Sequence, residues 1–239
     1  HNPEPLPENL IEISKKVIDT NADLGIVVDP DVDRLALICE DGSMFGEEYT
    51  LVSVADYVLS KTPGNTVSNL SSTRALADVT NYHNGNYFAS AVGEVNVVEQ
   101  MKEKNAVIGG EGNGGIIYPA LHYGRDALVG IALFLTNLAE KEISCKSLRE
   151  TYPNYFISKN KIDLDLTVDI SKIFKTLESK FSSYNIITID GLKINFDDGW
   201  VHLRRSNTEP IIRIYSESIT LDRANQLAED FISQIKELL

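Results

Sequence analysis

The stretch Leu24-Gly-Ile-Val-Val-Asp-Pro-Asp-Val-Asp-Arg-Leu-Ala-Leu-Ile-Cys39 decides the fold, because two apolar runs flank a short acidic segment. Each run, Leu24–Val28 and Leu35–Cys39, has the length and apolar content typical of a buried strand. Asp41-Gly42 follows the second run and is a strong turn signal. The stretch therefore predicts strand, acidic loop and strand, with the loop at a sheet end, where the binding sites of α/β proteins gather.

Outward from this stretch, apolar periodicity alternates between strands and helices. A helix is predicted before it, because Leu6, Leu10, Ile13 and Val17 recur at near-helical spacing. The strands predicted after it are Thr66–Leu70, Tyr87–Val92 and Ala106–Gly109. The helices predicted after it are Tyr49–Ser60, Thr73–His83, Glu94–Lys104 and Ala127–Lys141. This alternation predicts an α/β domain with a mostly parallel sheet.

The pattern changes after Pro153, where short strands follow one another. The predicted strands are Tyr155–Leu164, Ile186–Ile189, Leu192–Phe196, Val201–Arg204 and Ile211–Ser216. The predicted helices are Val168–Phe181 and Leu221–Leu239. Consecutive strands flanked by helices predict a separate α+β domain that begins near residue 153.

The composition indicates an ordinary globular protein with an acidic surface. The 239 residues carry a formal net charge of −13 and are 43% hydrophobic, which suits one large or two ordinary domains. The acidic balance argues against a nucleic-acid partner, since a phosphate backbone requires a basic face. It leaves small phosphorylated ligands open, because these need only a few local cations.

Compartment signals point to the cytoplasm. The longest apolar runs, such as Ala127–Leu135, are far shorter than the roughly 18 residues of a membrane span. His1–Asn9 is polar and carries three prolines, so no secretory signal is expected. Cys39 and Cys145 are expected to be reduced, buried thiols of a cytoplasmic protein.

The acidic segment has the composition of a cation site. Asp29, Asp31 and Asp33 alternate, so a curved backbone would direct three carboxylates at one Mg²⁺ or Ca²⁺. Arg34 directly after them suits a ligand whose phosphate bridges metal and protein. An EF-hand is disfavoured, because its sixth position requires glycine and its flanks must be helices. A solvated acidic turn is the other alternative.

A glycine cluster, Gly109–Gly115, follows the strand Ala106–Gly109. It satisfies G-x-G-x-x-G formally, but that fingerprint must open a helix, whereas Ile116-Ile117-Tyr118-Pro119 predicts extended chain and a turn. A dinucleotide site is therefore not expected. Glu111 and Asn113 offer paired acceptors and donors to the vicinal hydroxyls of a sugar. The alternative is a flexible surface turn.

A basic loop, Arg204–Pro210, lies between two predicted strands near the end of the chain. Hydroxyl, amide and guanidinium groups are concentrated here, which makes the loop a plausible phosphate cradle. The alternative is a strand-connecting turn with surface arginines. The candidate phosphate-binding residues are Arg204, Ser206, Asn207, Thr208 and Arg213.

Together, these three loops resemble those of the α-D-phosphohexomutase family, which includes phosphoglucomutase/phosphomannomutase and phosphoglucosamine mutase. Asp29–Arg34 is similar to the family's metal loop, usually D-G-D-G-D-R, and Gly110–Gly115 to its sugar loop, often G-E-x-S-G-H. Arg204–Pro210 is similar to its phosphate loop, R-x-S-G/N-T-x-P. The resemblance covers essentially the whole chain, with the loops in the family's order.

The resemblance implies three of the family's four domains. Residues 1–45 would be the end of domain 2, residues 46–152 domain 3 and residues 153–239 domain 4. The implied fold is a mixed-sheet α/β phosphohexomutase domain followed by an α+β domain of TATA-box-binding-protein-like fold. The family's phosphoserine loop, T-x-S-H-N-P in domain 1, does not occur in the sequence. The chain is therefore expected to be a C-terminal portion that lacks its N-terminal domains and is inactive alone.

The implied activity moves phosphate between the 1- and 6-positions of a hexose phosphate, through a phosphoserine and a hexose bisphosphate, with Mg²⁺ as cofactor. Asp29, Asp31 and Asp33 would hold Mg²⁺, and Arg34 would contact the transferring phosphate. Glu111 and Asn113 would bind sugar hydroxyls, and the basic loop with Arg213 would bind the non-reacting phosphate. The weaker candidates near the substrate are Arg74 and Glu94.

The sequence departs from the family pattern in the sugar loop, where Asn113 replaces serine and Gly115 replaces histidine. This leaves the hexose open among glucosamine, mannose and glucose phosphates, with glucosamine phosphate preferred. Two other functions stay open at this point. One is a sugar-phosphate binding module without chemistry, and the other is a structural Ca²⁺-binding domain built on the acidic loop.

Overall fold

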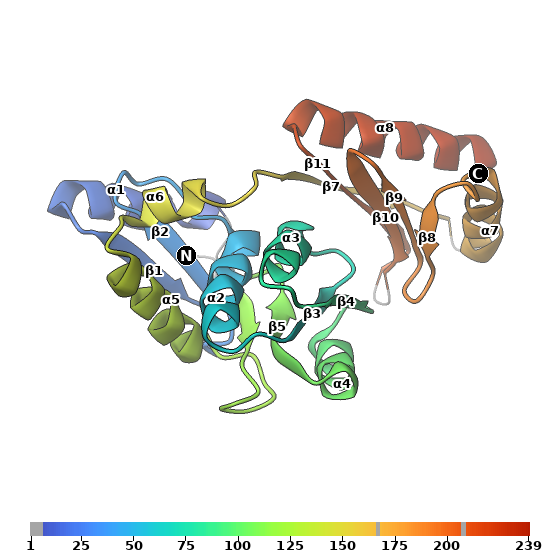
Figure 1. Ribbon diagram of the computed structural model, residues 1–239. Helices are drawn as coiled ribbons and strands as arrows, with labels where there is room; N and C mark the ends of the chain where they lie inside the picture. The colour runs from blue at the N-terminus through green and yellow to red at the C-terminus, as the bar shows by residue number, and fades with distance from the viewer. Residues whose placement is uncertain (1–6, 166–167, 207–208) are drawn as a thin grey trace. The chain divides into compact units, whose positions relative to one another are not determined.

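A computed structural model describes residues 7–165, 168–206 and 209–239 (Figure 1). Leu6 of the predicted first helix and the candidate residues Asn207 and Thr208 lie outside these ranges. The chain forms two compact units, His1–Pro153 and Asn154–Leu239. Across the described ranges, no helix combines the length and apolar content needed to cross a membrane. The predicted division of the first unit at residue 45 stays a prediction.

The first unit opens with a helix packed on a β-hairpin. A 3₁₀ turn, Pro7–Asn9, leads into α1 (Ile11–Thr20), followed by β1 (Leu24–Val28) and β2 (Leu35–Cys39). The two strands pair antiparallel, with Val28 opposite Leu35, so the acidic loop is the connection of this hairpin. Its core consists of Leu10, Val17, Ala36 and Ile38. Both strands occupy the residues that the sequence predicts.

The rest of the first unit is built around a four-stranded sheet. Its strand order is β4 (Tyr87–Ser90), β3 (Asn65–Asn69), β5 (Ala106–Glu111) and β6 (Gly115–Ile117). The first three strands are mutually parallel, as predicted. The fourth runs antiparallel to β5, because the glycine loop turns the chain straight back along the strand it has just left. The sheet is therefore mixed, and no helix follows the glycines.

Helices cover both faces of this sheet. They are α2 (Glu47–Lys61), α3 (Ala75–Tyr82), α4 (Glu94–Lys104) and α5 (Ala127–Lys141), whereas α6 (Cys145–Glu150) packs against α2 and β2. On the α4 face, Val97 and Met101 pack against Val67 and Ala106. The six-residue helix α6 was not predicted, because one and a half turns are too short to show a periodic pattern. Cys145 at its start and Cys39 are free and buried, as expected.

The second unit is an antiparallel sheet with helices on one face (Figure 1). Its strand order is β7 (Phe156–Asp163), β11 (Ile211–Ser218), β10 (Gly199–Arg205), β9 (Leu192–Phe196) and β8 (Asn185–Ile187). The helices α7 (Ile170–Lys180) and α8 (Leu221–Leu238) bury their apolar faces against it. The α+β prediction for this part of the chain is confirmed.

Candidate metal and ligand site

The acidic loop is curled by its own first residue. Asp29 Oδ1 accepts hydrogen bonds from the backbone N–H groups of Asp33, at 3.1 Å, and Arg34, at 3.0 Å. The Val32 N–H donates to the Asp29 carbonyl, and Val32 itself has φ of 58°. This curvature brings one carboxylate oxygen from each of Asp29, Asp31 and Asp33 to within 4.8 Å of the others.

The charges of the loop fit a bound cation. Burial is the main reason that the pKa of Asp33 lies above its usual value; Arg125 opposes that rise, and Asp29 and Asp31 add to it. Burial would also raise the pKa of Asp29, but the Arg34 and Asp33 backbone donors, the Asp33 side chain and the Arg34 charge together make the net shift downward. Asp33 Oδ1 is buried and has no hydrogen-bond partner among the described residues. Carboxylate oxygens, one of them buried without a hydrogen-bond partner, are the hard ligands that Mg²⁺ or Ca²⁺ prefers.

The structure excludes an EF-hand, because the loop joins the two strands of a hairpin rather than two helices. The Arg34 guanidinium lies beside the same carboxylates, with Nε 3.6 Å from Asp29 Oδ2 and 3.8 Å from Asp33 Oδ1. The residues that the sequence nominates in this loop are therefore gathered at one point.

The glycine loop sits directly on the acidic loop's exit strand. The Leu35 N–H donates a 3.0 Å hydrogen bond to the Gly114 carbonyl. Gly114 has φ of 84°, and a Cβ there would collide with the Leu35 carbonyl oxygen. Glycine is required at this position because both the backbone conformation and the close approach exclude a side chain. Two segments that are about 80 residues apart in the sequence thus share one edge of the unit.

Arg125 joins the acidic loop to the glycine loop. This residue comes just before α5, and its guanidinium donates to the carboxylates of Asp33 and Glu111, the second at 3.0 Å. The backbone N–H of Arg125 donates to Glu94 Oε1 at 2.9 Å, and its Nε lies 3.4 Å from Glu94 Oε2. One guanidinium therefore ties together three carboxylates from three different segments.

Glu111 is an internal anchor as well as a candidate ligand. The residue is 5% exposed and ends β5. Its Oε1 accepts from the Asn69 side chain at 2.9 Å and from the Gly93 N–H at 3.2 Å, so both lone pairs of that oxygen are occupied. Its Oε2 accepts from Arg125 and retains one acceptor position.

The other candidates of the first unit lie around this anchor. Asn113 is half-buried in the glycine loop, and its Oδ1 accepts from the Gly115 N–H at 3.2 Å. Glu94 joins the cluster through Arg125. Arg74 directly precedes α3 and follows the segment of Ser72, whose hydroxyl accepts from the Gly112 N–H at 3.0 Å. The structure thus places Arg74 two residues from a contact of the glycine loop.

The basic loop belongs to the second unit and is described by itself. Arg204 on β10 and Arg213 on β11 are paired directly across the two strands. Arg204 lies 3.8 Å from Asp190 Oδ2, and Arg213 lies 3.6 Å from Glu209 Oε2. Ser206 is buried, and its N–H donates to the Ile211 carbonyl, which closes the loop. The two arginines that the sequence nominates are therefore neighbours.

Sequence reasoning missed Arg125 and Asn69. Neither lies in a glycine-rich or acidic motif, and each acts through partners that are distant in the chain, such as Asp33 at 92 positions from Arg125. The one available signal is weak. Arg125 precedes the helix-capping Asp126, where a cation offers no helix-capping benefit because helix N-termini favour negative charge.

The fold and the carboxylate cluster define a class of α/β proteins with a candidate cation site. Comparison with known sequences and structures narrows the class. The chain belongs to the phosphoglucomutase/phosphomannomutase family: residues 1–42 match its alpha/beta/alpha domain II, residues 46–155 its alpha/beta/alpha domain III and residues 159–234 its C-terminal domain.

Individual relatives agree with this assignment. The chain is 35% identical to a phosphoglucomutase/phosphomannomutase of Thermococcus kodakarensis, over 100% of this chain and 52% of that protein. It is 32% identical to a probable phosphoglucosamine mutase of Methanopyrus kandleri, over 98% and 52% of the respective chains. The chain therefore spans about half the length of these curated relatives, which are named as mutases.

Solved structures share the fold. The crystal structure of a phosphoglucomutase/phosphomannomutase family protein from Burkholderia thailandensis superposes with a TM-score of 0.85 at 27% identity. The match covers 99% of this chain and 52% of that one. The predicted α/β and α+β fold class is confirmed.

Proposed function

We propose that the chain is the metal-, sugar- and phosphate-binding portion of a Mg²⁺-dependent phosphohexomutase. The whole enzyme would interconvert hexose 1-phosphate and hexose 6-phosphate through a phosphoserine and a hexose bisphosphate. The observation that carries this proposal is the convergence of Asp29, Asp31 and Asp33 within 4.8 Å, tied through Arg125 to Glu111. An acidic turn without a function would not need that link to a second loop.

In the acidic loop, Asp29, Asp31 and Asp33 would hold Mg²⁺, which supplies positive charge against the phosphoryl group in transfer. Asp29 sets the curvature of the loop through its two backbone hydrogen bonds, so Asp31 and Asp33 are presented without further rearrangement. Arg34 would contact the transferring phosphate, since a guanidinium matches the geometry of phosphate oxygens.

In the glycine loop, Glu111 and Asn113 would read sugar hydroxyls. The open acceptor position on Glu111 Oε2 lies on the same oxygen that Arg125 contacts, so the guanidinium would orient the carboxylate for a hydroxyl donor. Asn113 adds an amide, which can both donate and accept. Arg74 and Glu94 would border the sugar, Glu94 chiefly through its bonds to Arg125.

In the second unit, the basic loop would bind the phosphate that does not react. Arg204 and Arg213 supply two guanidinium groups on adjacent strands, and Ser206 supplies a hydroxyl. The proposal extends to Asn207 and Thr208 on the sequence pattern alone. Glucosamine phosphate is the preferred substrate, with mannose and glucose phosphates as alternatives, and the cytoplasm is the expected compartment.

Two measurements test the proposal. Calorimetry with glucosamine 6-phosphate, mannose 6-phosphate and glucose 6-phosphate should show binding that Arg204→Ala abolishes. Lys175→Ala, which removes an exposed cation of α7, is the control and should leave binding unchanged. If Arg204→Ala binds hexose phosphates as tightly as the parent does, the phosphate-binding role of the basic loop is refuted and a structural Ca²⁺-binding domain is favoured.

The second measurement is a mutase assay with Mg²⁺ and a hexose bisphosphate. The 239-residue chain should bind ligand without turnover, because its sequence lacks the T-x-S-H-N-P loop that carries the phosphoserine. Turnover by this chain would show that the nucleophile has been misplaced. If a longer gene product containing that loop also binds but does not turn over, the non-catalytic binding module becomes the better account.

A further inference from the structure

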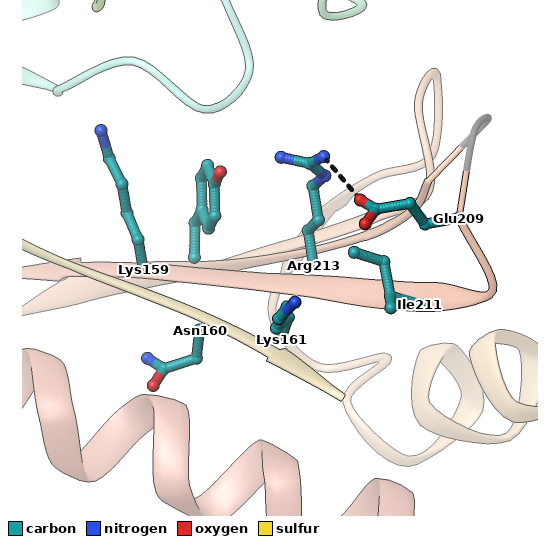
Figure 2. A pocket seen from close by; sticks show the side chains of 7 residues that line it. Lys159, Asn160, Lys161, Glu209, Ile211 and Arg213 are labelled. Carbon is teal, nitrogen blue, oxygen red and sulfur yellow. Dashed lines mark ion pairs between the residues drawn. The ribbon is translucent and has the colours of Figure 1, made fainter. Parts of the chain in front are cut away.

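Strand β7, which lies outside all three motifs, carries two lysines into a pocket beside Arg213. The pocket has a volume of about 370 Å³, and its lining includes Lys159, Lys161, Glu209, Arg213 and Tyr215. Figure 2 shows Lys159 and Arg213 standing on the same side of the sheet, while Asn160 points the other way, toward a helix. The pocket therefore lies on the sheet face opposite α7 and α8.

The strand register aligns these cations with those of the basic loop. Lys161 on β7 is directly opposite Arg213 on β11, and Arg213 is directly opposite Arg204 on β10. Three positive side chains thus follow one another across three adjacent strands. Lys159 is opposite Tyr215, one step along the same face. Like charges at directly opposed positions destabilise a sheet, so this row has a cost in the folded protein.

Acidic partners offset this row only weakly. Glu209 lies 3.6 Å from Arg213 Nη2 and is 52% exposed, and Asp190 lies 3.8 Å from Arg204 Nη1. Both separations are longer than a charge-assisted hydrogen bond. In a chain with 35 acidic and 22 basic residues, a row of like cations with such loose partners needs another source of negative charge. A phosphate dianion has the right charge, and the pocket of about 370 Å³ has room for it.

A rival explanation is that the lysines protect an edge strand. β7 is at the edge of its sheet, and edge strands often carry lysines that prevent pairing with another chain. Edge protection requires a charge on β7, but it does not require that charge to face Arg213 and Arg204. Edge protection therefore does not explain why Lys161 is aligned in register with Arg213 and Arg204.

We propose that Lys159 and Lys161 bind phosphate together with Arg213, so that the anion site of the second unit extends beyond the Arg204–Pro210 motif onto β7. Identifying the bound group as the phosphate ester of a hexose rests on the proposed function. Glu209, exposed and loosely paired, is the side chain that the phosphate would displace from Arg213.

Calorimetric titration of the whole chain with inorganic phosphate and with glucose 6-phosphate tests this proposal. Lys161→Gln should weaken the binding of both probes roughly tenfold, the effect of losing about 1.4 kcal/mol. Lys159→Gln should weaken it less, since Lys159 is opposite Tyr215 rather than an arginine. Lys175→Gln, an exposed lysine on α7, is the matched control and should bind as the parent does.

A stability measurement separates a binding role from a structural one. Without phosphate, Lys161→Gln should unfold at an equal or higher temperature than the parent, because it removes a like-charge neighbour of Arg213. Unchanged phosphate affinity in Lys161→Gln, together with self-association detected by light scattering, would establish edge protection and overturn the proposal.

The two probes also separate this inference from the proposed function. Binding of inorganic phosphate that depends on Lys161, with no binding of any hexose phosphate, would refute the mutase proposal and retain the anion site. If both probes bind and Lys161→Gln changes neither affinity, the extension of the anion site onto β7 is refuted and the mutase proposal is retained. Absence of phosphate binding by the parent chain would overturn the anion site itself.

Discussion

The Arg125 guanidinium donates a hydrogen bond to the Asp33 carboxylate, although 92 positions separate the two residues in sequence. The same guanidinium donates to Glu111 at 3.0 Å. Arg125 is 14% exposed and Glu111 is 7% exposed at their side chains, so this contact is largely shielded from water. The candidate metal loop and the candidate sugar loop are therefore parts of one electrostatic network.

Arg125→Ala should destabilise the first unit. The substitution leaves the carboxylates of Asp33 and Glu111 partly buried without their shared cation, which typically costs about 3 kcal/mol. For a unit of this size, thermal unfolding should begin roughly 6–12 °C lower. Lys15→Ala, an exposed lysine on α1, serves as the control and should unfold as the parent does. An unchanged melting temperature in Arg125→Ala would show that the network is not stabilising.

Mg²⁺ should stabilise the first unit through the acidic loop. At a concentration 100 times its dissociation constant, a ligand of the folded state adds about 2.7 kcal/mol. Asp31 is exposed, so Asp31→Asn should remove this gain while leaving the metal-free stability nearly unchanged. Asp29→Ala should lower both, because it also removes the acceptor of two backbone hydrogen bonds.

Thermal melts at constant ionic strength, with and without Mg²⁺, check this prediction. Asp23→Asn, an exposed aspartate ahead of β1, controls for nonspecific effects of a lost negative charge. If Asp31→Asn keeps the full Mg²⁺ shift, the cation binds elsewhere.

Val32→Gly should stabilise the chain or leave its stability unchanged. Val32 has φ of 58°, where a β-branched side chain is strained by about 1–2 kcal/mol. Glycine removes that strain, against an entropic cost of about 0.5–1 kcal/mol. Val95→Gly, at an exposed position in the first turn of α4, should instead destabilise, because glycine is a poor helix former. Urea unfolding of both variants measures the contrast, and a loss of stability in Val32→Gly similar to that in Val95→Gly would contradict the strain argument.

The stability of the second unit should fall as the pH drops below about 6.5. Burial lowers the pKa of His202 to about 4, and its Nε2 hydrogen-bonds the Asp190 carbonyl at 2.7 Å. Between pH 4 and 6.5 the unfolded state binds the proton and the folded state does not, so acidification favours unfolding. The full effect is about 3 kcal/mol, reached near pH 4, and no effect remains above pH 7.

Urea unfolding from pH 7.5 to 4.5 isolates this contribution. His202→Gln should show a shallower decline than the parent, because the remaining decline comes from other groups. If the free energy of unfolding falls with pH equally in His202→Gln and the parent, His202 has the same pKa in the folded and unfolded states.

Local patterns predicted the elements that hold the site. Leu24–Val28, Leu35–Cys39 and Ala127–Lys141 are found with the bounds that the sequence indicates, because each is a continuous apolar or periodic run closed by polar residues. The candidate metal ligands could also be predicted from a local pattern, since Asp29, Asp31 and Asp33 lie within five residues of one another in the sequence. Their geometry depends on hydrogen bonds within six residues.

Contacts between distant segments could not be predicted in this way. The burial of Glu111 is one example, because its neighbouring glycines suggest an exposed loop, whereas it ends a central strand. Arg125 is another, because an arginine before a helix looks like any surface cation until the fold places Asp33 and Glu111 beside it. The alignment of Lys161 with Arg213 likewise follows from strand register, which separate motifs do not encode.

The glycine loop is packed into the interior of the first unit, and this has a consequence for laboratory evolution. Within Glu111–Gly115, every residue except Asn113 is buried, and Gly114 lies against the Leu35 backbone. Most members of a random library across this loop should therefore misfold, because substitutions at its buried positions disturb the packing. Asn113 is the half-buried residue of this loop, so substitutions there should test the proposed sugar contact with the least effect on folding.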